Sequence, residues 1–184
     1  MTLTHQLPIS RTTFFEALER GDQISFYFCD WSSLVGELCN WAGTDLHREA
    51  FATRWVTHGA KIREQTQDDR LLVRVLRQWL PLYQGDGLTL YRGESADRAG
   101  REQYGLCWTT DVEVATMFAS GLNAVRPGGG VLLRAHAPRD AIITGPGRHS
   151  NHLQEAEHTV DPSKLTGIEI LSRFQPADCR PLFT

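Results

Sequence analysis

The chain has 184 residues, 41% of them hydrophobic, with 19 Lys and Arg against 22 Asp and Glu. This length and composition favour a globular protein of one domain, or of one domain with a substantial extension. A net charge of -3 does not favour general binding to nucleic acids or membranes, although it allows a local basic site. No apolar run is long enough to span a membrane, and residues 1–11 lack the basic-then-apolar order of a signal peptide.

Four cysteines are spread along the chain without a C-x-x-C pair: Cys29, Cys39, Cys107 and Cys179. A chain of this size can bury enough apolar surface to fold without disulfides. We therefore expect reduced thiols in a cytoplasmic protein. A secreted protein with two disulfides is the alternative.

The first 84 residues carry the spacing of amphipathic helices. In residues 9–20, Phe14, Phe15 and Leu18 form an apolar stripe, with Ser10 as a candidate N-cap and Gly21 as a stop. Residues 24–28 fit either a short strand or the start of a helix. The other predicted helices run from Trp31 to Trp41, from Thr44 or Asp45 through Ile62, and from Asp68 or Asp69 to Leu80. Their tryptophan and leucine stripes indicate core packing.

After Gly85-Asp86-Gly87 the pattern changes to short strands and turns. One helix is predicted near 111–120, where Asp111 can serve as the N-cap. The predicted strands lie at 88–93, 105–109, 130–136, 140–144, 155–160 and 167–173. We therefore expect an α+β protein, with a helical region at 1–84 and a strand-rich region at 85–184.

Arg92 is an arginine in an apolar strand pattern. Side chains alternate along a strand, so Leu88, Leu90 and Arg92 share one face. An arginine on an apolar face is costly unless it meets an anion, and a guanidinium can hold a phosphate through two parallel hydrogen bonds. The alternative is that Arg92 ends an edge strand and pairs with a surface carboxylate.

Glu155 and Glu157 are two residues apart. In an extended segment they would lie on one face, roughly 7 Å apart. Two such carboxylates repel each other, so one of them can have a raised pKa and act as a base near neutral pH. The alternative is a solvated edge strand whose polar face is Glu155, Glu157 and Thr159.

Histidines near these glutamates could also suggest a metal site. The spacing of His149, His152 and His158 matches no usual zinc pattern, so no metal is expected. The glycine run at 128–130 lacks the lysine of a phosphate-binding P-loop. Hydrolysis of a nucleoside triphosphate is therefore not indicated.

The order of these motifs resembles the ADP-ribosyltransferase superfamily, in its form with an arginine, a serine-threonine-serine motif and a Glu-x-Glu motif. The resemblance covers roughly residues 85–173, and each motif alone is short. It implies a catalytic core at 85–184 built as a split, mostly antiparallel β-sandwich, with the helical N-terminal half packed on it. The matching pieces are Tyr91-Arg92-Gly93, Gly105 to Thr110 with Val114-Ala115-x-x-Phe118-Ala119, and Glu155-Ala156-Glu157 with Val160-Asp161-Pro162.

The resemblance implies roles for four of these residues. Glu157 would accept a hydrogen bond from the ribose of NAD and stabilise the oxocarbenium-like sugar formed as nicotinamide leaves. Glu155 would orient or deprotonate the acceptor. Arg92 would bind the pyrophosphate, and the nicotinamide amide could lie against the backbone of Gly93.

The middle motif departs from the family pattern. One alignment puts Cys107, Trp108 and Thr109 where serine-threonine-serine is expected, although a thiol is a weak donor with which to hold the catalytic glutamate. A register shifted by one uses Thr109 and Thr110 instead, and both registers remain open. Trp108 also fits plain core packing.

Two aromatic residues complete the set that the resemblance implies. Phe118 could stack on the cationic nicotinamide ring, or it could be a core residue. Tyr104 could contact a ribose of NAD.

The function implied by the resemblance is mono-ADP-ribosylation of a macromolecule with release of nicotinamide. NAD is the co-substrate, no metal or membrane is involved, and an arginine in a protein is the first guess for the acceptor, ahead of nucleic acid. A bacterial toxin or effector held in check by an antitoxin or immunity protein would suit such a chain. The alternatives are an NAD glycohydrolase, and a non-catalytic NAD- or protein-binding module, which Cys107 motivates.

Overall fold

The computed structural model describes residues 10–21 and 29–176. The chain divides into two compact units, residues 1–82 with 147–149 and residues 83–146 with 150–184. The boundary expected between 84 and 85 is two residues from this division. The segment 24–28 and Cys179 lie outside the described residues.

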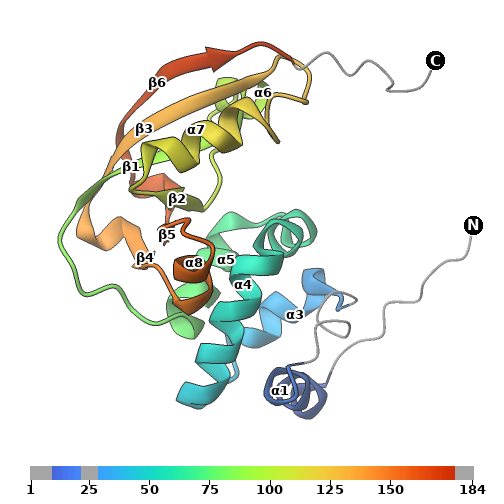
Figure 1. Cartoon of the computed structure of the whole chain (residues 1–184). Helices are drawn as coiled ribbons and strands as arrows, with labels where there is room; N and C mark the ends of the chain where they lie inside the picture. The colour runs from blue at the N-terminus through green and yellow to red at the C-terminus, as the bar shows by residue number, and fades with distance from the viewer. Residues whose placement is uncertain (1–9, 22–28, 177–184) are drawn as a thin grey trace, which may run out of the picture. The chain divides into compact units, whose positions relative to one another are not determined.

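The first unit is helical (Figure 1). The four predicted helices are present. Their N-caps, in chain order, are Ser10, Asp30, Thr44 and Asp68, so Thr44 and Asp68 rather than Asp45 and Asp69 cap the last two. The second of these helices ends at Leu38 and does not reach Trp41. The helices are α1 (Arg11–Glu19), α3 (Trp31–Leu38), α4 (Asp45–Thr66) and α5 (Asp69–Trp79).

Aromatic rings fill the core of this unit. The ring of Phe14 lies 6.5 Å from that of Trp31 and 5.8 Å from those of Trp41 and Trp79. The Trp79 indole N–H donates to the carbonyl of Leu38 at 3.0 Å. The aromatic stripes are therefore packing, as predicted.

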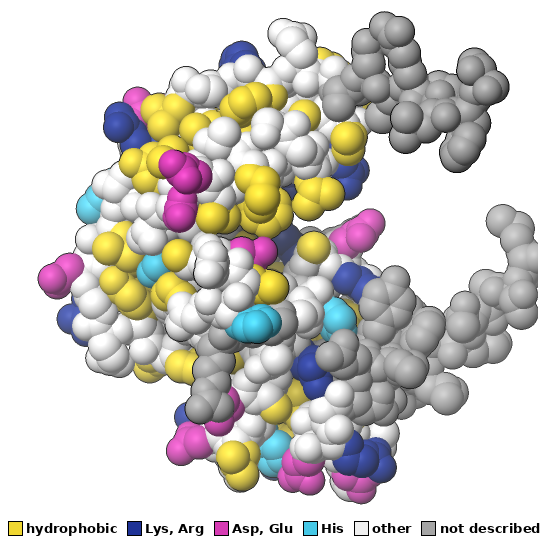
Figure 2. Space-filling model, in the orientation of Figure 1, with side chains coloured by type: hydrophobic (Ala, Val, Ile, Leu, Met, Phe, Trp, Pro, Cys, Tyr) yellow, Lys and Arg dark blue, Asp and Glu magenta, His cyan; other side chains and the backbone are white. Residues whose placement is uncertain are grey.

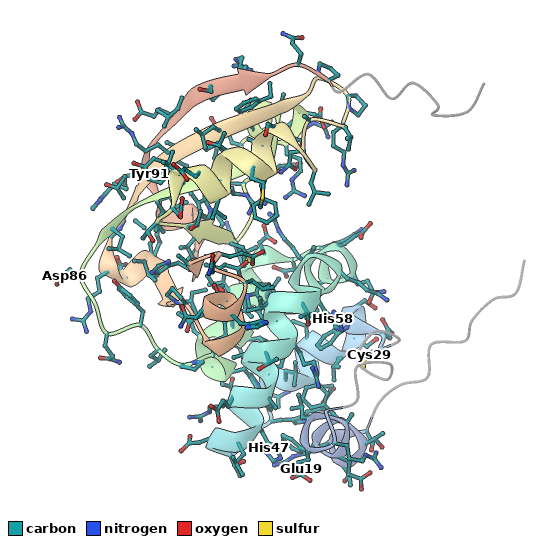
Figure 3. All side chains as sticks on the ribbon, viewed as in Figure 1. Glu19, Cys29, His47, His58, Asp86 and Tyr91 are labelled. Carbon is teal, nitrogen blue, oxygen red and sulfur yellow. The ribbon has the colours of Figure 1, made fainter. Side chains whose placement is uncertain are left out.

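His47 links the start of α4 to α1. Its Nδ1 accepts a hydrogen bond from the backbone N–H of Thr44 at 3.1 Å, and its Nε2 lies 2.9 Å from a carboxylate oxygen of Glu19 (Figure 3). The Phe15 ring stacks on the imidazole at 4.4 Å. A histidine thus completes the capping box of α4, where a glutamate or glutamine is usual.

The second unit is built on one antiparallel sheet of six strands in the order β4-β5-β2-β1-β3-β6 (Figure 1). All six predicted strands are found, so the α+β class and the antiparallel pairing are confirmed. The strands are β1 (Leu88–Ser95), β2 (Cys107–Thr109), β3 (Gly130–Ala137), β4 (Ile142–Thr144), β5 (Glu157–Val160) and β6 (Thr166–Phe174).

A narrow seam runs through the centre of this sheet. One residue pair, Tyr91 with Thr109, joins β1 to β2, whereas eight pairs join β1 to β3. The sheet therefore consists of two three-stranded halves, β4-β5-β2 and β1-β3-β6. The split β-sandwich and the packing of the helical half on it stay predictions.

Helices α6 (Ala96–Gly100) and α7 (Val112–Ser120) belong to the second unit, and the chain division falls within α8 (Arg148–His152). Helix α7 was predicted together with its N-cap Asp111, whose carboxylate accepts from the backbone N–H groups of Glu113 and Val114 at 2.8 and 3.2 Å. The five-residue helices α6 and α8 were missed, because little more than one turn gives no readable periodicity.

The first half of β3, residues 130–133, is buried on both faces, whereas Arg134 and His136 further along are exposed. Val131, Leu133 and Ala135 belong to the larger apolar cluster of this unit, which is its main core. Leu132 packs with Ala115 and Ala119 of α7 on the other face. Helix α7 therefore covers the face opposite the main core.

Gly93 lies directly beneath α7. A Cβ at this position would be 2.3 Å from the backbone nitrogen of Ala119 and 2.6 Å from the carbonyl oxygen of Ala115. We expect Gly93→Ala to displace α7 and destabilise the fold by about 3 kcal/mol, or about 10 °C in Tm. Thermal unfolding monitored by circular dichroism measures this loss.

Gly100→Ala is the matched control, because nothing lies within 4 Å of a Cβ at that position. The control should stay within about 1 kcal/mol of the parent. Equal Tm values for the two variants would contradict the close approach of α7 to β1.

Candidate active site

The Arg92 side chain is held by two partners from its own unit. Its Nε donates to Glu94 at 3.0 Å, and its Nη1 donates to the carbonyl of Cys107. The guanidinium lies against Gly105, where a Cβ would come within 2.2 Å of the central carbon of the group. The alternative of an edge strand with a surface partner does not apply, since β1 is central and Glu94 is buried.

Glu94 was missed by the sequence analysis and is the anion that Arg92 meets. The residue is 2% exposed, and its carboxylate accepts from the backbone N–H groups of Ser95 and Gly105 at 3.0 and 3.2 Å. Burial acts to raise its pKa, but the charges of Arg92 and Arg98, together with the hydrogen bonds from Arg92 and Ser95, hold the pKa below the usual range. The sequence could have indicated Glu94 as the partner of Arg92, because residues two apart on a strand share a face.

Glu157 is the first residue of β5, which is the strand next to β2. Its backbone lies opposite Thr109, which is itself opposite Tyr91 of β1. Burial raises the pKa of Glu157 to about 7, and the neighbouring charge of Glu155 adds to the rise. A hydrogen bond from Cys107 and the charge of Arg92 act in the opposite direction.

Cys107 occupies the position from which a side chain can hold Glu157. Its backbone pairs with Thr159, so it is a diagonal neighbour of Glu157 on the paired strands. The Cys107 side chain hydrogen-bonds to the Glu157 carboxyl group. Which of the two registers aligns with serine-threonine-serine stays a prediction.

The paired glutamates do not form the regular extended segment that the sequence analysis expected. Strand β5 begins at Glu157, and Ala156 has a left-handed backbone with φ of 45°. The expectation that Glu155 and Glu157 project from one face of a strand was therefore wrong. Their charges still interact, as the raised pKa of Glu157 indicates.

The other residues of the middle motif have separate positions. Trp108 is 1% exposed and belongs to the main core, so its ring offers no surface to a ligand. Thr109 is buried and donates its hydroxyl to the carbonyl of Glu155 at 2.7 Å. Thr110 is exposed after the end of β2.

The remaining predicted site residues lie around β1. Tyr104 packs against the main core, where burial raises its pKa. Phe118 is half-buried on α7, above Gly93. The carbonyl of Gly93 accepts a hydrogen bond from the side chain of Asn123 at 3.1 Å, a contact that the sequence did not indicate.

The structure thus brings Arg92, Cys107 and Glu157 together on the adjacent strands β1, β2 and β5. Arg92 contacts the backbone of Cys107, the Cys107 side chain contacts Glu157, and the charge of Arg92 acts on Glu157. A cation and a carboxylate with a pKa near neutrality therefore lie on either side of β2, close enough for their charges to interact. Such a pair can bind an anionic ligand and stabilise positive charge on it.

Several features of the described residues bear on other classes of function. On the face drawn in Figure 2, basic and acidic side chains are interspersed. Within residues 10–21 and 29–176, no helix is both long and apolar enough to cross a membrane, and no group of three His, Cys, Asp or Glu side chains is placed to hold a metal. The three described cysteines form no disulfide.

Comparisons of the chain with protein-family models, with curated proteins and with solved structures found no match.

Proposed function

We propose that this protein is an ADP-ribosyltransferase that transfers ADP-ribose from NAD to a macromolecule and releases nicotinamide. The observation that carries the proposal is that Arg92 and Glu157 lie on either side of β2 and their charges interact across it, while the Cys107 side chain is hydrogen-bonded to the Glu157 carboxyl group. The order of motifs that resembles the superfamily spans the same three strands.

Arg92 can bind a phosphate without losing its internal partners. A guanidinium has five N–H donors. Glu94 and the Cys107 carbonyl take one each, and the other three have no partner among the described residues. A pyrophosphate could therefore receive two parallel hydrogen bonds from a side chain that is already oriented.

Glu157 suits the chemistry at the ribose. As the bond between the nicotinamide nitrogen and the ribose breaks, its electron pair returns to the pyridinium ring and positive charge develops on the sugar. An ionised Glu157 would accept a hydrogen bond from the ribose hydroxyl and stabilise that charge. The acceptor then bonds to the sugar carbon and loses a proton, with Glu155 as the proposed base.

The position of Cys107 is compatible with a catalytic role for the fold, although its weak thiol donor is what motivates the non-catalytic alternative. Its thiol takes the place of the serine expected to hold the catalytic glutamate, and it contacts that carboxyl group. The acceptor proposed first is an arginine in a protein, in keeping with the Glu-x-Glu motif. A toxin or effector role with an inhibitory partner is part of the same proposal.

The test is a single assay with NAD labelled on the adenylate. Purified protein and a cell lysate are incubated with it, and the products are separated by size and identified by mass spectrometry. We expect released nicotinamide together with a labelled macromolecule that resists nuclease treatment.

Other outcomes of this assay distinguish the rival functions. Free ADP-ribose without a modified macromolecule would indicate an NAD glycohydrolase. Label removed by nuclease would move the acceptor to nucleic acid. No released nicotinamide under any condition would favour a non-catalytic module and overturn the proposal.

A further inference from the structure

The chain enters β5 through an unusual turn. Gln154 and Ala156 both have left-handed backbones, with φ of 57° and 45°. This conformation is unfavourable for residues with a Cβ, and it persists only where surrounding contacts fix it. The turn therefore has to be held from outside its own residues.

Ser150 makes two of the contacts that hold this turn. Its backbone carbonyl accepts from the N–H of Glu155 at 3.0 Å, and its hydroxyl oxygen accepts from the N–H of Glu157 at 2.7 Å. The residue is 0% exposed. One buried serine thus fixes the backbone on both sides of Ala156.

Thr109 holds the same turn from β2. Its hydroxyl donates to the carbonyl of Glu155 at 2.7 Å and accepts from the N–H of Asp111 at 3.0 Å. His158 adds a third contact through its Nδ1, 2.9 Å from the carbonyl of Ala156. The turn is therefore tied to β2, to the start of α7 and to α8.

We propose that Ser150 is a positioning residue for Glu157, acting together with Thr109. Its hydroxyl sets the direction in which the backbone leaves the turn, and so keeps the Glu157 carboxyl group against Cys107. The contribution to turnover rests on the proposed function. The effect on the carboxyl group itself does not.

Loss of the Ser150 hydroxyl should loosen this arrangement. The N–H of Glu157 would lose its acceptor, and the turn would relax to bring that N–H to water. The Glu157 carboxyl group would move away from Cys107 and become hydrated, so its pKa would fall from about 7.

The experiment measures the titration of Glu157 directly. The 184-residue chain with 13C-labelled glutamate side chains is titrated by NMR, and Glu157→Gln assigns the signal. In Ser150→Ala we expect the midpoint to fall to about 6 or lower as the carboxyl group gains water. NAD turnover should fall at least about tenfold with KM little changed, since the lost effect is on orientation.

Two further variants complete the design. Thr109→Val keeps the shape of the side chain but removes the donor to Glu155, and it should lower the midpoint in the same direction. If Ser150→Ala does not fold, the titration of Thr109→Val decides whether contacts to the turn position Glu157. Ser172→Ala, at an exposed position of β6, is the control and should match the parent.

A Glu157 midpoint equal to that of the parent in the folded variants would overturn the positioning role. If the parent itself shows no NAD turnover, the proposed function fails, and the NMR titration still decides the role of Ser150. A lowered midpoint in both variants supports it in either case.

Discussion

Glu157→Gln is expected to abolish release of nicotinamide while leaving NAD affinity nearly unchanged. Glutamine keeps the size of the side chain but removes the charge that the developing oxocarbenium needs. We expect turnover to fall by about 100- to 1000-fold, the effect of removing one electrostatic contact to a transition state. Nicotinamide release measures the rate, and calorimetry measures the affinity.

The pH profile gives a second readout of the same residue. Because the ionised form is required and burial raises the pKa of Glu157 to about 7, turnover by the parent should rise as the pH increases through 7. A rate in Glu157→Gln close to that of the parent, or a flat profile between pH 6 and 8, would remove Glu157 from the reaction.

The same substitution should make the protein more stable at high pH. The native pKa of about 7 lies above the ordinary value of 4.5, so ionisation of Glu157 costs stability as the pH rises from 4.5 to 7. This cost is up to about 3 kcal/mol above pH 7 and absent below pH 4.5. Urea unfolding of parent and variant at pH 4 and pH 8 should therefore differ at the higher pH only.

Arg92→Ala is expected to weaken both NAD binding and the fold. Two charge-assisted hydrogen bonds to a phosphate correspond to about a 100-fold loss of affinity. Loss of Arg92 would also leave the buried Glu94 without its nearest cation, a loss of about 3 kcal/mol. Calorimetry with NAD and urea unfolding at pH 7 measure the two effects.

A double variant separates binding from folding. Arg92→Met combined with Glu94→Gln removes both charges, so we expect it to recover stability while NAD affinity stays low. Arg101→Ala is the surface control, since its side chain is exposed and pairs with Asp97. Unchanged NAD affinity in the folded double variant would remove Arg92 from the binding site.

The fold was largely readable from the sequence because its patterns are local. Apolar spacing and capping residues such as Thr44 and Asp111 define helices within a few residues. Strand pairing is less accessible, because it joins residues far apart in the chain. Nothing in the sequence indicated that β1 and β2 share one residue pair, or that α7 crosses Gly93.

The sequence predicted the charged residues of the candidate site, but not the residues that hold them in place. Arg92 stood out because charge is unusual in an apolar strand pattern, and Glu157 because it follows Glu155 by two residues. Glu94 and Ser150 did not, since their roles depend on burial and on neighbours brought close by folding. The left-handed Ala156 was equally hidden, because alanine gives no signal for that conformation.

The seam between β1 and β2 has a consequence for amide exchange with solvent. Two contacts across it use the side chains of Arg92 and Glu94, which reach the Cys107 carbonyl and the Gly105 amide. The two halves of the sheet should therefore open apart at a lower free energy than either half unfolds. Deuterium uptake at Gly105 should follow the ionisation of Glu94, because a carboxylate protects that amide in place of a strand partner.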